Sequence, residues 1–239
     1  MTKEPLLLHI ETATEVCSVA LSKGPAILGV EESADGNSHS KNLLPFIERL
    51  MAGTAHRIEE IDGVVVSIGP GSYTGLRIGT STAKGIAYSL GKPVITVGTL
   101  ESIAYGAAES WADDGLPAPQ YVAMIDARRM EVFAGHYDEH LQEVDTPAAV
   151  IVDENAFRAM LDEHRIVFCG NGMPKCKELL SPHPNALFVE QPLSARSLLK
   201  PALKKWEAQA FADTAYFEPF YLKEYVAAKP VVKGLHPNT

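Results

Sequence analysis

The sequence has few cysteines and a shortage of basic residues, and each shortage argues against a class of protein. Cys17, Cys169 and Cys176 are odd in number, far apart and without CxxC spacing, so they indicate reduced thiols of a cytoplasmic protein rather than a disulfide framework or metal site. Basic residues number 21 against 30 acidic ones, for a formal net charge of −9. Since a nucleic-acid-binding domain usually has a basic surface, the chain is not expected to bind nucleic acid unaided, although a partner in a complex could supply that contact.

Long apolar runs and low-complexity tracts are also missing. Residues 1–5 lead into a short apolar run that His9 and Glu11 interrupt, so the pattern predicts neither a signal peptide nor a membrane span. Hydrophobic residues make up 46% of the 239 positions, which is enough for one large or two small domains with cores of their own. We therefore expect a folded, cytoplasmic protein without a membrane contact.

The most informative segment spans residues 61–97 and has the pattern strand, glycine turn, helix and strand. Residues 64–68 are apolar at nearly every position, as in a parallel strand that is buried on both faces. Residues 69–72 turn the chain, and Ser72 or Thr74 can cap the helix that follows. The turn matches neither GxxxxGK[ST] nor GxGxxG, so a structural turn is favoured over a phosphate-binding loop.

The helix in this segment has an unusual stripe of small residues, spaced four apart and therefore on one face: Gly75, Gly79, Ala83 and Ala87. Four larger side chains border the stripe: Leu76, Thr82, Ile86 and Leu90. Glycine inside a helix costs about 0.5–1 kcal/mol relative to alanine, so a close approach of another backbone is expected here. Two sources of that backbone remain open, namely the same domain or a second subunit.

The order of elements in the first half of the chain recurs in the second half. Residues 6–31 are predicted to form three strands joined by polar turns, and the pattern of strand, acid-led turn and strand returns at residues 121–137. A stretch rich in Pro, Gly and Asp, 113–119, separates the two halves. The sequence therefore predicts an α/β protein with two duplicated lobes, 1–112 and 113–239, each a mixed sheet flanked by helices.

Two duplicated lobes of this kind are the architecture of the actin, sugar kinase and Hsp70 (ASKHA) superfamily, in which the acid-led turns of both lobes face a cleft that holds ATP. On that comparison, six residues are candidates for a nucleotide-facing surface: Glu11, Thr12, Thr14, Asp126, Gly170 and Gly172. Capping of each turn by its own carboxylate is an equally good explanation. Glu11 is one methylene longer than the aspartate of ATP-using members, which counts against a kinase-like Mg–ATP site.

Four sequence blocks together resemble one family. They are IETATEVCSVAL at residues 10–21, HSKNLLPFI at 39–47, IGPGSYTGLRIGTSTAKGIAYSLGKPVITVGTLE at 68–101 and YVAMIDARRMEVF at 121–133. With these blocks, of which GPGSYTGLR is the most specific, the chain resembles the TsaB (YeaZ-type) family of bacterial tRNA threonylcarbamoyladenosine biosynthesis. The resemblance is dense in the first half of the chain and thin in the second.

The resemblance implies that the chain is a subunit of a larger enzyme. TsaB-type proteins are similar to TsaD, the metal-dependent enzyme that transfers a threonylcarbamoyl group to N6 of adenosine 37 in tRNA reading codons that begin with A, but they are implied to be its inactive partners. They pair with TsaD through the first two helices of their first lobe. A TsaE-type ATPase joins the complex, and tRNA is contacted only through the complex. The resemblance thus implies no catalytic residue, metal or cofactor in this chain.

The metal site of TsaD-type enzymes offers a test within the sequence. Those enzymes carry a pair of metal-binding histidines, four residues apart, after the strand that follows the glycine-turn helix. The matching positions here are Thr99 and Ile103, and isoleucine cannot bind a metal. His39 has Leu43 four residues further on, so His39 is expected to make a local hydrogen bond rather than to bind a metal. The sequence therefore predicts that this site holds no metal.

The implied partner interface lies on the first two helices of the first lobe. In the isolated chain we expect an exposed apolar flank there, which a symmetric homodimer would cover. The predicted interface residues are His39, Leu43, Leu44, Ile47, Leu50, Gly75, Leu76, Gly79, Ala83, Ile86, Ala87 and Leu90.

Two other functions compete with the subunit role. An ATP-dependent small-molecule phosphotransferase of the same superfamily would take its carboxylate base and phosphate site from Glu11, Asp126 and the turn at residues 170–172. A peptidase is disfavoured, because the chain has neither HExxH nor a nucleophile elbow.

Overall fold

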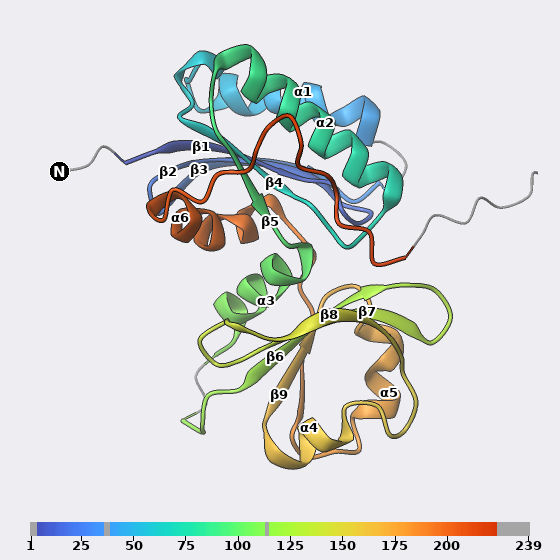
Figure 1. The fold of residues 1–239 in the computed structure, drawn as a ribbon. Helices are drawn as coiled ribbons and strands as arrows, with labels where there is room; N and C mark the ends of the chain where they lie inside the picture. Colours follow the sequence, from blue (N-terminus) through green and yellow to red (C-terminus); the bar gives the residue numbers. More distant parts are fainter. Residues whose placement is uncertain (1–3, 36–38, 113–114, 224–239) are drawn as a thin grey trace, which may run out of the picture.

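The computed structural model describes residues 4–35, 39–112 and 115–223. These residues form two lobes, each built on a five-stranded mixed sheet with helices on both faces (Figure 1). No helix in these ranges is both long enough and apolar enough to span a membrane.

The sheet of the first lobe has the strand order β3-β2-β1-β4-β5. Strand β2 pairs antiparallel with β1 and with β3, whereas β1, β4 and β5 run parallel. The prediction of a buried parallel strand is confirmed, because β4 is buried at every position. The strands are β1 (Leu6–Glu11), β2 (Cys17–Lys23), β3 (Ala26–Ser33), β4 (Gly63–Ser67) and β5 (Val94–Val97).

Helices cover both faces of this sheet. On one face, α1 (His39–Gly53) and α2 (Tyr73–Leu90) share a core with the inward side chains of the sheet. On the other face lie the 3₁₀ helix η3 (Ala195–Leu198) and helix α6 (Leu199–Glu207), which come from the far end of the described chain (Figure 1). A further 3₁₀ helix, η1 (Ile58–Glu60), precedes β4.

The sheet of the second lobe has the order β10-β9-β6-β7-β8. Strands β6, β7 and β8 form an antiparallel meander, and β6, β9 and β10 run parallel. Read from the edge of the meander, the order β8-β7-β6-β9-β10 matches the order β3-β2-β1-β4-β5 of the first lobe. The predicted duplication is therefore confirmed. The strands are β6 (Gln120–Asp126), β7 (Glu131–Tyr137), β8 (Glu143–Ile151), β9 (Ile166–Cys169) and β10 (Ala186–Val189).

The helices of the second lobe also pack on both faces. Helix α3 (Thr99–Ser110) covers one face, and α4 (Arg158–Glu163), η2 (Pro174–Cys176) and α5 (Lys177–Leu180) cover the other. Thus α3 precedes the predicted linker yet packs on the second sheet, while α6 follows it and packs on the first. Helices from each side of the predicted boundary between residues 112 and 113 thus pack on the sheet of the other side. The boundary itself stays a prediction.

The small-residue stripe of α2 faces the turn between β1 and β2. A Cβ atom at Gly75 would lie 2.1 Å from the Thr12 carbonyl oxygen, and one at Gly79 would lie 2.2 Å from Thr12 Oγ1. Thr12 Oγ1 donates a hydrogen bond to the Gly75 carbonyl oxygen at 2.8 Å, which holds this contact together. Of the two sources that the sequence left open, the same lobe therefore supplies the closely approaching backbone.

Alanine substitutions at two glycines of α2 should have opposite effects on the stability of the protein. Gly75→Ala should lower the free energy of unfolding by about 1–3 kcal/mol, because the added Cβ overlaps the Thr12 carbonyl. Gly85→Ala is the matched control, since a Cβ there meets nothing within 4 Å, and it should raise that free energy by about 0.5–1 kcal/mol. Urea denaturation measures both values, and a stabilising Gly75→Ala would contradict the packing described here.

Candidate functional site

The first acid-led turn directs its carboxylate into the lobe. Glu11 is fully buried at the end of β1, where Oε1 accepts hydrogen bonds from the Ala13 amide and from Ser67 Oγ, both at 2.7 Å. Its Oε2 has no partner among the described residues, and burial raises the pKa of Glu11 to about 7. The carboxyl group therefore caps its own turn, which is one of the two explanations that the sequence left open.

The neighbouring threonines are also engaged within the lobe. Thr12 is fully buried against α2, and Thr14 Oγ1 accepts a hydrogen bond from the Val16 amide at 3.4 Å. These contacts orient the turn toward the interior of the first lobe, so Glu11, Thr12 and Thr14 do not form an open ligand surface in this conformation.

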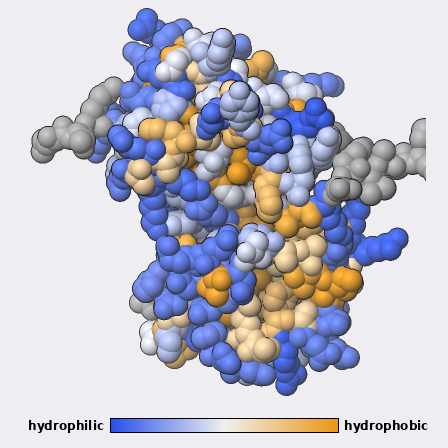
Figure 2. All heavy atoms as spheres, viewed as in Figure 1, coloured by the Kyte–Doolittle hydropathy of each residue, from blue (hydrophilic) through white to orange (hydrophobic). Residues whose placement is uncertain are grey.

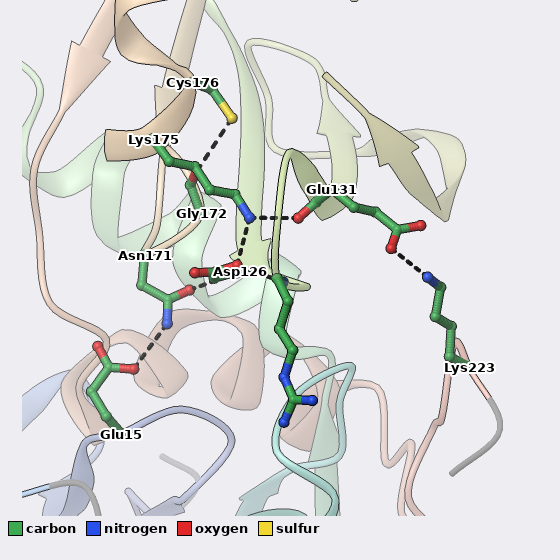
Figure 3. Close-up of polar contacts among 9 residues, drawn as sticks. Glu15, Asp126, Glu131, Asn171, Gly172, Lys175, Cys176 and Lys223 are labelled. Carbon is green, nitrogen blue, oxygen red and sulfur yellow. Dashed lines mark hydrogen bonds and ion pairs between the residues drawn. The ribbon is translucent and has the colours of Figure 1, made fainter. Parts of the chain in front are cut away.

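The second acid-led turn is more exposed and carries a network of polar contacts (Figure 3). Asp126 Oδ1 accepts hydrogen bonds from Lys175 Nζ at 2.5 Å and from the Arg128 amide at 2.7 Å. Burial by itself would raise the pKa of Asp126, but the hydrogen bonds and charges of Lys175 and Arg128 outweigh it and lower that pKa. Lys175 Nζ also donates to the Glu131 carbonyl oxygen, so it ties both ends of the β6–β7 turn together.

The glycines after β9 allow the chain to approach β6. A Cβ atom at Gly170 would lie 2.3 Å from the Met124 carbonyl oxygen, and one at Gly172 would lie 2.9 Å from the Ile125 carbonyl carbon. Between them, Asn171 Oδ1 accepts from the Asp126 amide at 3.1 Å. Close packing thus accounts for both glycines without a bound phosphate.

The structure brings some predicted site residues together and separates others. Asp126, Gly170 and Gly172 lie around Asn171, whose Nδ2 donates to Glu15 Oε2 at 2.9 Å and so joins the two lobes (Figure 3). Glu11 takes no part in this contact. Sequence reasoning missed Lys175, because its partner Asp126 lies 49 residues away in the chain, and it gave no contact for Asn171 within the turn at residues 170–172.

The positions that match the metal-binding histidines have structural roles. Thr99 Oγ1 accepts a hydrogen bond from the Gly69 amide at 3.1 Å, and Ile103 lies in the core between α3 and the second sheet. His39 Nε2 donates to the Thr14 carbonyl oxygen at 2.8 Å, so His39 makes a hydrogen bond, but with a residue 25 positions earlier in the chain and not with the local partner that was expected. Within residues 4–35, 39–112 and 115–223, no three His, Cys, Asp or Glu side chains are grouped so that they could hold a metal ion.

Most predicted interface residues are buried inside the first lobe, which corrects the expectation of an exposed apolar flank. The physical reason is that the apolar sides of α1 and α2 face the sheet, and the small-residue stripe receives the β1–β2 turn. The buried residues are His39, Leu43, Ile47, Leu50, Gly75, Leu76, Gly79, Ala83 and Ala87. Of the remaining three, Ile86 and Leu90 are half-buried and Leu44 is 57% exposed.

Residues outside the predicted interface also contribute to the exposed surface on and beside these helices. Tyr88 on α2 is 86% exposed, and Tyr216, in the segment after α6, is 82% exposed. Lys84 links the two elements, since its Nζ donates to the Ala215 carbonyl oxygen at 3.3 Å and lies 4.4 Å from the centre of the Phe217 ring. We call the following set the outer helical surface: Leu44, Ile86, Tyr88, Leu90 and Tyr216.

The segment after α6, residues 208–223, crosses from the first lobe to the second (Figure 1). Ala212 forms a bridge to β5, and the Phe220 amide donates at 2.6 Å to the carbonyl oxygen that follows β4. Lys223 then forms an ion pair with Glu131 of β7. This segment, which we call the C-terminal strap, was not predicted as an ordered element.

The two lobes, with their shared topology and acid-led turns, define the class of the protein as an ASKHA-type fold. Component A of (R)-2-hydroxyglutaryl-CoA dehydratase from Acidaminococcus fermentans is similar in fold alone, with a TM-score of 0.50 and 11% identity over 87% of this chain and 100% of that chain.

The chain belongs to a family described as "TsaD: tRNA N6-adenosine threonylcarbamoyltransferase", which matches residues 28–236. The tRNA threonylcarbamoyladenosine biosynthesis protein TsaB of Haemophilus influenzae is 36% identical over 127 residues, which are 53% of this chain and 51% of that protein. This chain thus spans about half the length of the curated relatives it matches. YeaZ from Pseudomonas aeruginosa is 27% identical and has a TM-score of 0.78 over 91% of this chain and 100% of that chain. These similarities confirm the resemblance to the TsaB (YeaZ-type) family.

The buried carboxyl of Glu11 makes stability depend on pH. A pKa of about 7 in the folded state and 4.5 in the unfolded state means that the folded state binds its proton more tightly. The contribution is fully present below pH 4.5 and is lost as the pH rises to about 7, for a total of about 3 kcal/mol. Glu11→Gln removes the titration, so the difference in unfolding free energy between wild type and Glu11→Gln should change across this range. A constant difference from pH 4.5 to 7.5 would show that Glu11 does not titrate as expected.

Proposed function

We propose that this chain is a non-catalytic subunit that binds a TsaD-type threonylcarbamoyltransferase. In this role it supports the formation of N6-threonylcarbamoyladenosine at position 37 of tRNA reading codons that begin with A. Its family and the TsaB name of its relatives support the place in this pathway. The chain's net charge of −9 fits a subunit that contacts tRNA only through the complex.

The observation that carries the non-catalytic role is the chemistry of two positions at the start of α3. Where TsaD-type enzymes are expected to have two histidines, this chain has Thr99, whose hydroxyl is engaged with Gly69, and Ile103, which is packed in a core. Neither side chain can replace an imidazole as a metal ligand. The catalytic metal is therefore assigned to the partner enzyme.

The outer helical surface is the proposed partner-binding surface. It includes two exposed tyrosines, Tyr88 and Tyr216, and tyrosine is enriched among residues that dominate binding energy. On this proposal, the same surface forms a heterodimer with the TsaD-type enzyme and a symmetric homodimer when the chain is alone. A TsaE-type ATPase joins the heterodimer, and the complex works in the cytoplasm.

The alternative of an ATP-dependent phosphotransferase has less support from the site. The carboxyl group of Glu11 is enclosed in the first lobe, and the carboxylate of Asp126 is engaged by Lys175. Neither group is free to act as a base or to bind magnesium in this conformation.

Reconstitution tests the proposed role directly. A TsaD-type enzyme, its tRNA, threonylcarbamoyl adenylate and the ATPase are assayed with and without this chain, and tRNA modification is quantified by mass spectrometry. We expect the chain to raise the rate at least about tenfold, equivalent to 1.4 kcal/mol of activation free energy. An unchanged rate would defeat the assignment.

Substitutions on the outer helical surface test the proposed interface. Tyr88→Asp and Leu44→Asp should each weaken binding to the TsaD-type enzyme by at least about tenfold, since each places a charge in a desolvated contact. Both residues are exposed, so folding should be unaffected. Ile151→Asp is the matched control, because Ile151 is 72% exposed on β8 of the other lobe. Isothermal titration calorimetry measures the affinities, and an equal loss in the control would contradict the proposed surface.

A further inference from the structure

A cavity of about 290 Å³ lies where the two lobes and the C-terminal strap meet. Its apolar walls come from four separate elements: Ile68 and Pro70 after β4, Leu100 in α3, Pro147 in β8 and Phe220 in the strap. Figure 2 shows hydrophobic residues gathered around the junction of the two lobes. The volume is close to the lower end of the range for small-molecule sites.

One polar side chain in this cavity is buried and has no partner. Tyr137 on β7 is 3% exposed, and its hydroxyl makes no hydrogen bond within the described part of the chain. The hydroxyl is not among the fully buried atoms that lack a partner, so it is open to the cavity and available to a ligand. Burial raises the pKa of Tyr137, and the charges of Glu143 and Glu101 raise that pKa further, so the hydroxyl stays protonated. Both carboxylates line the same cavity as Tyr137.

The two carboxylates that line the cavity differ in their charge balance. Glu101 Oε2 is 3.1 Å from Lys205 Nζ and also accepts from the Gly98 amide at 3.3 Å. Glu143, at the start of β8, has no cationic partner among the residues that the structure describes. Glu143 is exposed, so the rim of the cavity carries a solvated carboxylate without an ion pair, and the Tyr137 hydroxyl lies in the same lining.

We propose that this cavity binds a primary alkylammonium group carried on an apolar stem. An ammonium has three N–H donors and no acceptor, and the lining of the cavity offers acceptor oxygens on three residues, the phenol of Tyr137 and the carboxylates of Glu143 and Glu101. The stem lies against the apolar walls, while the ammonium neutralises Glu143. Glu143 disfavours an anionic ligand by repulsion, and an uncharged ligand gains nothing from that exposed carboxylate.

Two kinds of ligand carry an ammonium group on an apolar stem: a free aliphatic diamine and the lysine side chain of a protein. The cavity is separate from the outer helical surface, so the proposal does not depend on the proposed partner role. The two ideas can fail independently of each other.

The test uses the full chain and two small probes of equal length. Cadaverine, which carries ammonium groups on a five-carbon stem, should bind saturably in calorimetric or NMR titrations. 1,5-Pentanediol, which keeps the stem and removes the charge, should bind at least about tenfold more weakly. Equal binding of the diol would overturn the proposal, because the charge would then contribute nothing.

Variants assign the binding to this cavity. Glu143→Gln should weaken cadaverine binding by about tenfold and Tyr137→Phe by a smaller factor, since the first removes the charge and the second only an acceptor. Tyr137→Phe should leave stability intact, because the hydroxyl it removes has no partner. Glu139→Gln, on the exposed turn of the same hairpin, is the control and should bind as wild type does. Unchanged affinity in both cavity variants would refute the site.

A second probe distinguishes the two sources. Nα-acetyl-lysine methylamide presents the same ammonium on a lysine side chain with peptide groups in place of the second amine. Tighter binding of this derivative would assign the cavity to a protein lysine, and tighter binding of cadaverine would assign it to a free diamine; both results support the proposal. Failure of both probes to bind would overturn it.

Discussion

The contact of Thr12 with Gly75 and Gly79 is the constraint on which the first lobe depends. The Thr12 hydroxyl donates to the Gly75 carbonyl, and the missing side chains of both glycines leave room for the β1–β2 turn. The Ser72 amide extends this contact by donating to the Ala13 carbonyl at 2.7 Å, and Gly71 also lies against Ala13. The turn and the start of α2 are thereby locked together. Because this contact occupies the small-residue face of α2, a partner can meet only the opposite face of the helix.

The two lobes share one topology but are not independent in packing. Helix α3 covers the second sheet although it follows the strands of the first, and α6 returns to cover the first sheet. Polar contacts add to this exchange, since Glu15 reaches Asn171 and Lys223 of the strap reaches Glu131. The lobes are therefore connected by exchanged helices, a crossing strap and side-chain contacts, all of which would have to adjust if the lobes moved apart.

The duplicated acid-led turns are engaged in different ways in the two lobes. In the first lobe, burial encloses the carboxyl group of Glu11 and raises its pKa. In the second lobe, the carboxylate of Asp126 accepts a hydrogen bond from Lys175. Each carboxylate stabilises its own turn instead of facing a shared ligand. Two polar side chains without a hydrogen bond to another described residue, Tyr137 and Glu143, line the cavity between the lobes.

The sequence by itself determined the two-lobed topology, the buried parallel strands and the absence of a histidine pair at Thr99 and Ile103. These features follow from local patterns of apolar, glycine and acidic residues, which a single chain reveals. Only the tertiary structure decided that the small-residue stripe faces inward, that α3 and α6 exchange lobes, and that Lys175 and Asn171 meet Asp126. Each of these depends on contacts between residues distant in the chain, and a helix with one small-residue face looks the same whether its own lobe or a second molecule fills the space. Periodicity identifies the face, but the path of the whole backbone determines what packs against it.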